Sequence, residues 1–258
     1  MLTVAAGVAA AATVFGSGAW SAASAASLTI SAQGAAGTSV TGSSQFRVSG
    51  DTTVSIRVAR LSGGTAHIVN GPDSTLTRAV QFPAYVSSGT YPRAVLGVTP
   101  TQGLALSPGS GNFQFGAVFR LDSASSGRTD DNGDNIFQRG LSSESSLFKL
   151  EVDHGRPACT VRGGSGTVIT RSSTVVSRNT WYRTTCTRVG RQVTVSVVPY
   201  GAGKTAISNA ASGSMGSLSW PSTRPASIGG KLTDSGAIAA SASDQFNGAI
   251  AQVSIHAL

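Results

Sequence analysis

The chain has 258 residues, of which 40% are hydrophobic and 12% charged, with 32 glycines. This hydrophobic content is enough for a core, and the length suits a single all-β domain once a leader is removed. The net charge is +8, but no two basic residues are adjacent, and they occur singly along the expected strands and turns. A nucleic-acid surface gathers basic and aromatic residues on one face, so the sequence predicts no nucleic-acid partner.

The first 26 residues carry no charge and include an apolar, alanine-rich run from Thr3 to Gly16. Small residues follow, and we interpret residues 1–26 as a signal peptide cut near Ala25 or Ala26. No Lys or Arg precedes the run, which is unusual for such a leader, and a buried helix or a membrane anchor is the alternative. The run is shorter than the roughly 20 apolar residues of a span. We therefore expect an exported protein without membrane insertion after cleavage.

Residues 27–50 are rich in Ser, Ala, Gly and Thr. This low-complexity composition is typical of a linker, and we expect a weakly ordered leader here. The folded domain is then predicted over residues 51–258, beginning with a strand at residues 52–60.

Period-two alternation and β-branched residues predict short strands along the rest of the chain, and no segment has the periodicity of an amphipathic helix. In the run Phe113–Asp122, Phe113, Phe115, Ala117 and Phe119 share one face, which we expect to be buried. Residues 201–217 are expected to form a loop of small residues. Other strands are predicted at residues 79–86, 93–98, 136–140, 167–170, 174–177, 225–232 and 244–258. Many short strands with frequent turns favour a sandwich or jelly roll.

Two hairpins are expected between residues 147 and 198, one turning at residues 153–157 and the other at residues 189–191. The only two cysteines, Cys159 and Cys186, lie one in each hairpin. In an exported chain an even pair of cysteines is typically bridged. We therefore predict a disulfide between them, joining adjacent or facing strands.

Six segments in this order resemble laminin G-like domains, which are concanavalin A-like jelly rolls found in secreted bacterial proteins. The segments are residues 113–120, 135–140, 148–152, 179–188, 227–231 and 246–255. The resemblance covers Thr52 to Leu258. It implies an all-β sandwich of two antiparallel sheets that binds carbohydrate or protein. Many relatives have Trp-His where this chain has Trp181-Tyr182, so a role for that histidine does not carry over.

Concanavalin-like glucanases place three acidic residues at alternate positions of one strand, so that two of them flank the scissile bond. Glu151 and Asp153 match the first two positions, but Gly155 stands at the third. There is also no Gly-x-Ser-x-Gly elbow for a serine nucleophile. We predict no catalytic residues and no enzymatic activity.

The loop that contains Asp130, Asn132 and Asp134 spaces oxygen ligands as calcium sites do. It is not an EF-hand, because Asn135 and Leu141 stand where that motif has Gly and Glu. Some laminin G-like domains bind calcium at a rim of the sandwich, and these three residues are our candidate ligands. A solvated polar turn is the alternative.

Aromatic rings could stack on sugars, and Tyr200 and Trp220 are the ones expected to be exposed beside the small-residue loop. One of Trp181 and Tyr182 should face the core, because the two alternate on a strand. The function that the sequence favours is an exported, non-catalytic module that binds a glycan or a cell-envelope polymer. The alternatives are a structural or adhesion domain with a protein partner, or a degenerate glycoside hydrolase. The residues that bind the ligand are not identified by the sequence.

Overall fold

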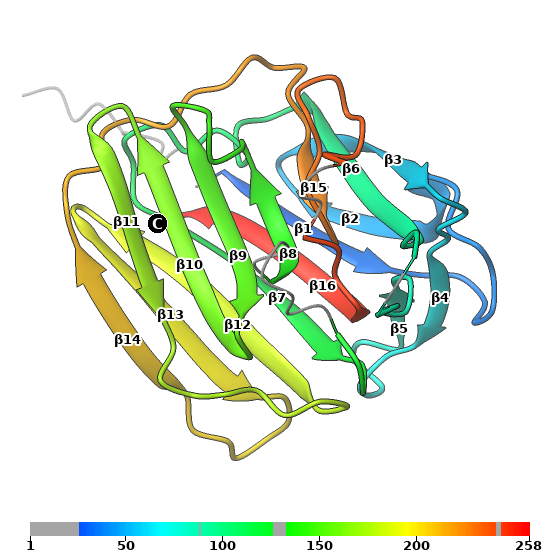
Figure 1. Cartoon of the computed structure of the whole chain (residues 1–258). Helices are drawn as coiled ribbons and strands as arrows, with labels where there is room; N and C mark the ends of the chain where they lie inside the picture. Colours follow the sequence, from blue (N-terminus) through cyan, green and yellow to red (C-terminus); the bar gives the residue numbers. More distant parts are fainter. Residues whose placement is uncertain (1–25, 88, 126–132, 241–243) are drawn as a thin grey trace, which may run out of the picture.

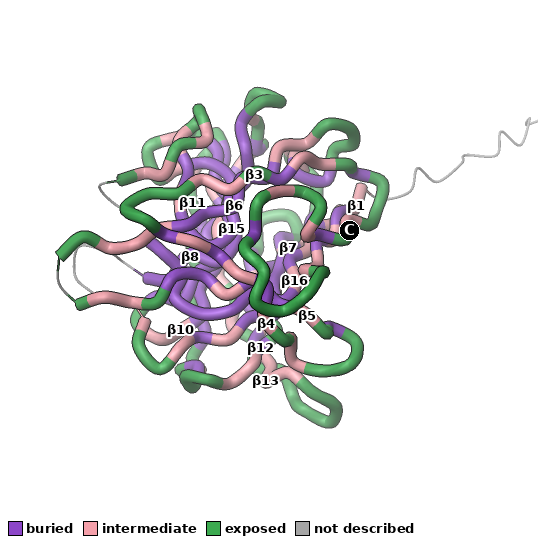
Figure 2. The backbone as a smooth tube through the Cα atoms, turned by 90° about the vertical axis from the view of Figure 1, so that its right-hand side faces the viewer, coloured by how far each residue is buried: buried purple, intermediate pink, exposed green. Residues whose placement is uncertain are grey.

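The computed structural model describes residues 26–87, 89–125, 133–240 and 244–258. Two antiparallel sheets lie face to face (Figure 1). In this part of the chain the one helical element is the 3-10 turn η1, Ser43–Gln45, so the expected scarcity of helix is confirmed. The buried residues lie inside both layers, and the exposed residues are concentrated in the loops (Figure 2). Strands at the middle of the sheets, such as β8, are buried at every position, whereas β12 and β13 alternate between buried and more exposed residues.

The nine-stranded sheet has the order β14-β13-β12-β7-β16-β1-β2, with β5 paired to β16 and β4 to β5. Its strands are β1 (Ser27–Ala32), β2 (Phe46–Gly50), β4 (His67–Asn70), β5 (Arg78–Gln81), β7 (Phe113–Leu121), β12 (Trp181–Val189), β13 (Gln192–Pro199), β14 (Ile207–Ser212) and β16 (Gly248–Ala257).

The seven-stranded sheet has the order β11-β10-β9-β8-β15-β6-β3. Its strands are β3 (Thr53–Leu61), β6 (Arg93–Gln102), β8 (Asp134–Arg139), β9 (Leu147–Asp153), β10 (Arg156–Gly163), β11 (Gly166–Arg171) and β15 (Ala226–Ile228). The two predicted hairpins are confirmed as β9–β10 and β12–β13, and they belong to different sheets.

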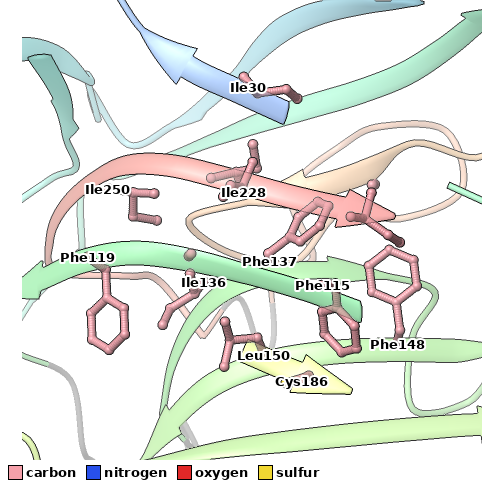
Figure 3. Packing of buried hydrophobic residues seen from close by; sticks show 14 of the residues in the cluster. Ile30, Phe115, Phe119, Ile136, Phe137, Phe148, Leu150, Cys186, Ile228 and Ile250 are labelled. Carbon is pink, nitrogen blue, oxygen red and sulfur yellow. The ribbon is translucent and has the colours of Figure 1, made fainter. Parts of the chain in front are cut away.

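The core fills the space between the sheets and is rich in phenylalanine (Figure 3). Phe148 of β9 joins rings from both sheets, with its ring centroid 5.0 Å from that of Phe115 and 5.4 Å from that of Phe137. The predicted inward face of β7 is confirmed, because Phe113, Phe115, Ala117 and Phe119 all belong to this cluster. Burying these large apolar side chains is the main favourable contribution to the folding of the sandwich.

The predicted disulfide between Cys159 and Cys186 is present and joins facing strands. Cys159 lies on β10 and Cys186 on β12, so the bond connects the two sheets through the core. Both residues are fully buried. The bond therefore fixes the spacing of the sheets from the inside.

The expected leader at residues 27–50 is wrong as a description of order, because this segment contributes β1 and β2. Leu28 pairs with Ile255 of β16 on one side and with Gly50 on the other. Leu28 and Ile30 are buried in the core. The segment is ordered because pairing with a strand more than 200 residues away supplies the contacts that its composition does not predict. The signal peptide expected at residues 1–26 lies outside the described residues, apart from Ala26.

Three other expectations need correction. The segment expected as a loop over residues 201–217 contains β14, which pairs with β13 from Ile207↔Val197 to Ser212↔Gln192. Small residues have low strand propensity, but the neighbouring strand supplies the hydrogen bonds. Residues 174–177 form no strand, although Val176 is buried. The strand expected over residues 79–86 ends at Gln81, two residues before Pro83, which cannot donate to a ladder.

Candidate binding surface

The outer face of the seven-stranded sheet is partly covered by the chain that follows β15. Gly229 turns the chain with a φ of +86°, and a Cβ there would lie 2.0 Å from a ring carbon of Phe82. Leu232 then packs on the sheet, because a Cβ added to Gly97 of β6 would meet its Cδ1 at 3.1 Å. Further along, the carbonyl of Ala240 accepts a hydrogen bond of 2.6 Å from Arg93. We call residues 229–240 the covering loop.

A groove lies between the covering loop and the outward residues of β3 and β6. Core packing of Ile56, Leu96 and Val98 leaves the alternate positions of these strands facing outward. The groove has a volume of about 410 Å³. Its lining side chains are mostly hydroxyl-bearing, charged or small: Ser55, Arg57, Val58, Ala59, Gly97, Thr99, Thr223, Pro225, Asp234, Ser235 and Gly236.

A second depression of about 570 Å³ adjoins the groove and shares Thr223, Asp234 and Ser235 with it. Arg224, which is 3% exposed, contributes to its lining, and Glu144 lies beside it. The shared residues make the two depressions one continuous surface, which we call the polar groove. It carries opposite charges side by side rather than a single-sign patch.

Two buried arginines hold the walls of the polar groove. Arg224 Nη2 lies 2.7 Å from Glu144 Oε1, and its Nη1 donates to the carbonyl of Thr233 at 2.6 Å. Arg139 Nη2 donates to the carbonyl of Arg224 at 2.8 Å. Burial, reinforced by the charge of Arg224, lowers the pKa of Arg139 to about 10. Multiple hydrogen bonds to fixed carbonyls make this wall rigid, which reduces the ordering cost of binding a ligand.

The acidic pair considered for hydrolysis lies on the same outer face but does not line the polar groove. Lys149 Nζ is 2.6 Å from Glu151 Oε2, and Glu151 is only 6% exposed. Burial raises the pKa of Glu151, and Lys149 opposes that shift. Asp153 forms an ion pair with Arg171 and a hydrogen bond with His154. Both carboxylates are therefore engaged by neighbouring cations.

The calcium ligands predicted at Asp130 and Asn132 lie outside the described residues. Asp134 is described, and the structure buries it at the start of β8. Its Oδ1 accepts the backbone N–H of Asn247 at 3.0 Å. Within residues 26–87, 89–125, 133–240 and 244–258, no three His, Cys, Asp or Glu residues gather as metal ligands. The calcium site stays a prediction.

The two aromatic residues that the sequence predicted to be exposed, Tyr200 and Trp220, are both half-buried. Trp220, expected to be exposed, is half-buried: its Nε1 donates to the carbonyl of Ser146 at 3.1 Å and its ring packs edge-on against Phe148. Tyr182 is the member of its pair that faces the core, as one of the two had to. Tyr200 is half-buried beneath Arg183, with 5.2 Å from the guanidinium carbon to the ring centroid.

Sequence reasoning missed the residues of the polar groove. Strand alternation could have placed Arg57 on an outward face, but it could not have shown that the covering loop lies beside Arg57. Asp234 and Ser235 come from a loop whose position depends on the Arg224–Glu144 ion pair, 80 residues apart in sequence. No local pattern carries that information.

Residues 129–257 match the model of the laminin G domain family. Among solved structures, the binding domain of Paraclostridial mosquitocidal protein 1 aligns with a TM-score of 0.52 and 14% identity. The alignment covers 82% of this chain and 47% of that one, so the chain spans about half the length of that domain.

A protein of unknown function from Shewanella oneidensis MR-1 aligns with a TM-score of 0.52 and 11% identity, over 91% of this chain and 87% of that one. At these identities the similarities establish the fold alone. No curated protein matches the sequence. In the described ranges, no helix is both long and apolar enough to cross a membrane.

Proposed function

Because the chain belongs to the laminin G domain family, we propose that it is an exported, non-catalytic binding module that holds a carbohydrate in the polar groove. The observation that carries the proposal is the lining of that groove. Ser and Thr hydroxyls, one exposed guanidinium and one exposed carboxylate are the groups that pair with sugar hydroxyls. Arg57 and Asp234 would fix the orientation of the sugar, since charged groups make the stronger hydrogen bonds.

The volume of the groove suits a short stretch of a glycan. Its 410 Å³ lies within the range of sites for small molecules, and the adjoining depression extends it. Among the described residues that line the two depressions, none carries an aromatic ring, so hydrogen bonding rather than stacking would hold the ligand. We therefore expect weak affinity, with a Kd of roughly micromolar to millimolar.

Export is supported by the uncharged leader at residues 1–26 and by the disulfide between Cys159 and Cys186. Disulfides persist in oxidising compartments and are rare in the cytosol. A degenerate hydrolase is disfavoured because Glu151 and Asp153 are held by Lys149 and Arg171. A catalytic pair must flank the scissile bond, and these carboxylates lie away from the polar groove.

The test is a glycan array, run with calcium and with chelator, followed by calorimetry of the best binder. Arg57→Ala should weaken binding at least about tenfold, because a charge-assisted hydrogen bond contributes roughly 1.5–3 kcal/mol. Arg47→Ala is the matched control, since Arg47 is an exposed arginine on β2 outside the groove. An array without binders would overturn the carbohydrate proposal. Equal glycan affinities of the wild type and Arg57→Ala would show that the glycan binds outside the polar groove.

A further inference from the structure

The two lateral sides of the sandwich differ in how their strand edges are protected. On one side lie β2 and β3, the last strands of their sheets, and on the other lie β14 and β11 (Figure 1). We call these the covered edge and the open edge. An unprotected edge offers a row of backbone donors and acceptors to another strand.

The covered edge is occupied by the chain itself. Ser43 Oγ accepts the backbone N–H of Ile56 in β3 at 2.8 Å, and Gly42 forms a bridge to Arg57. The edge also carries charge, with Arg47, Arg57 and Arg60 all exposed. Covering segments and charged side chains are the usual protection against pairing between edges.

The open edge has neither form of protection at β14. In the described part of the chain β14 pairs with β13 alone, so its outer side has no strand beside it. Toward the facing sheet, Asn209 Nδ2 donates to the carbonyl of Arg171 at 3.2 Å, and Ala211 packs against the core. Two large apolar side chains are exposed on this edge, Ile169 of β11 at 58% and Ile207 of β14 at 47%.

Charge favours a second copy as the partner of this edge. The protein has a net charge of +8, which opposes self-association over most of its surface. Residues 205–223, which include all of β14, contain no charged residue. Ser208, Ala210 and Ser212 are small and exposed, so two copies could approach there without steric or electrostatic conflict.

We infer that β14 is a self-association edge, at which a second copy of this chain places its own β14 antiparallel to the first. Antiparallel pairing of identical strands has two-fold symmetry and closes after two copies. The axis passes beside Ala210, near the middle of the strand, so that the Ala210 residues of the two copies face each other. The pairing extends the nine-stranded sheet across both copies and brings Ile169 and Ile207 toward the contact. The polar groove, formed partly by β3, lies toward the covered edge and stays open in both copies.

Sedimentation equilibrium of the disulfide-bonded protein tests the inference. The wild type should approach twice the mass of one chain as its concentration rises into the micromolar range. Ala210→Lys should weaken the dimer at least tenfold, because it places two like charges opposite each other at the axis. Ser208→Lys, also exposed, provides a second variant if the first fails to fold.

Ser49→Lys is the matched control. Ser49 is an exposed serine on β2, the strand at the other end of the same sheet, and its replacement adds the same charge. This variant should associate like the wild type. A wild type that remains monomeric, or folded lysine variants of β14 that dimerise like the wild type, would overturn the inference. Glycan binding by the Ala210→Lys monomer should be unchanged, which separates this result from the outcome for the polar groove.

Discussion

On the outer face of the seven-stranded sheet, the covering loop is held by charged and polar contacts in addition to the packing of Leu232, whereas apolar side chains cover part of the outer face of the nine-stranded sheet. On the first, Lys231 pairs with Asp244, and Asn135 Nδ2 donates to the carbonyl of Gly230 at 2.8 Å. On the second, a satellite cluster lies beneath the segment that includes β4 and β5, made of Leu76, Ala79, Val118, Ala249 and Ala251.

The depressions described beside the two covers differ in volume. The depressions on the polar side measure about 410 and 570 Å³, against about 220 Å³ beside Tyr200 on the apolar side. Directional ion pairs and hydrogen bonds hold a cover at a few points, so a groove remains between them. Apolar contacts are non-directional and bring surfaces together over their whole area. The polar groove beside the covering loop is therefore better suited to a ligand than the depression beside Tyr200.

The largest expected effect comes from removing the ion pair that holds the covering loop on the seven-stranded sheet. Lys231→Met removes the partner of Asp244, which is only 1% exposed. An uncompensated buried charge costs about 3–5 kcal/mol, and the free energy of unfolding should fall by that amount in urea titrations. Lys204→Met provides the control, because Lys204 is exposed in the loop before β14 and its loss should cost less than about 0.5 kcal/mol. Similar stabilities of the two variants would contradict a role for the ion pair.

The second largest effect is expected from removing the disulfide that joins the two sheets. Replacing Cys159 and Cys186 by alanine together should lower the free energy of unfolding by about 3–4 kcal/mol, since the disulfide closes a segment with a sequence separation of 27. Far-ultraviolet circular dichroism should be unchanged, because each sheet keeps its own hydrogen bonds. Mass spectrometry of the unreduced protein should find no free thiol. Two free thiols, or a bond between chains, would refute the pairing.

The smallest effect is a difference in pH dependence between the two faces. Burial raises the pKa of Glu151 on the seven-stranded face above its usual 4.5. The folded state then binds the proton more tightly than the unfolded state, so this group makes the protein less stable as the pH rises from 4.5 through the folded pKa. On the other face, hydrogen bonds from the backbone of Leu76 and Thr75 lower the pKa of Asp73 below 3.8. The stabilisation by Asp73 is present above pH 3.8 and is lost as the pH falls through the folded pKa.

Urea unfolding of Glu151→Gln and Asp73→Asn across the acidic range separates the two contributions. The stability of the wild type minus that of Glu151→Gln should decrease as the pH rises from about 4 to 7. The corresponding difference for Asp73→Asn should increase as the pH rises from about 2 to 5. Differences that change in the same direction for both variants would contradict the contrast between the faces.

The sequence by itself determined the strands that alternate strongly and the pairing of the only two cysteines. Alternation of Phe113, Phe115 and Phe119 is sufficient to assign a buried face, because side chains of a strand alternate between its two sides wherever the strand lies. The disulfide followed from composition, since Cys159 has only one possible partner within the chain. The family resemblance agrees with the match over residues 129–257.

Only the tertiary structure decided the features that depend on distant partners. β1 and β14 have weak local signals and exist because β16 and β13 pair with them. Trp220 is half-buried because the carbonyl of Ser146, 74 residues earlier, accepts its N–H. The polar groove likewise depends on a loop held through Arg224. In a sheet protein the hydrogen bonds and the burial of a segment come from chain far away in sequence, so local pattern predicts strands better than it predicts the surfaces they build.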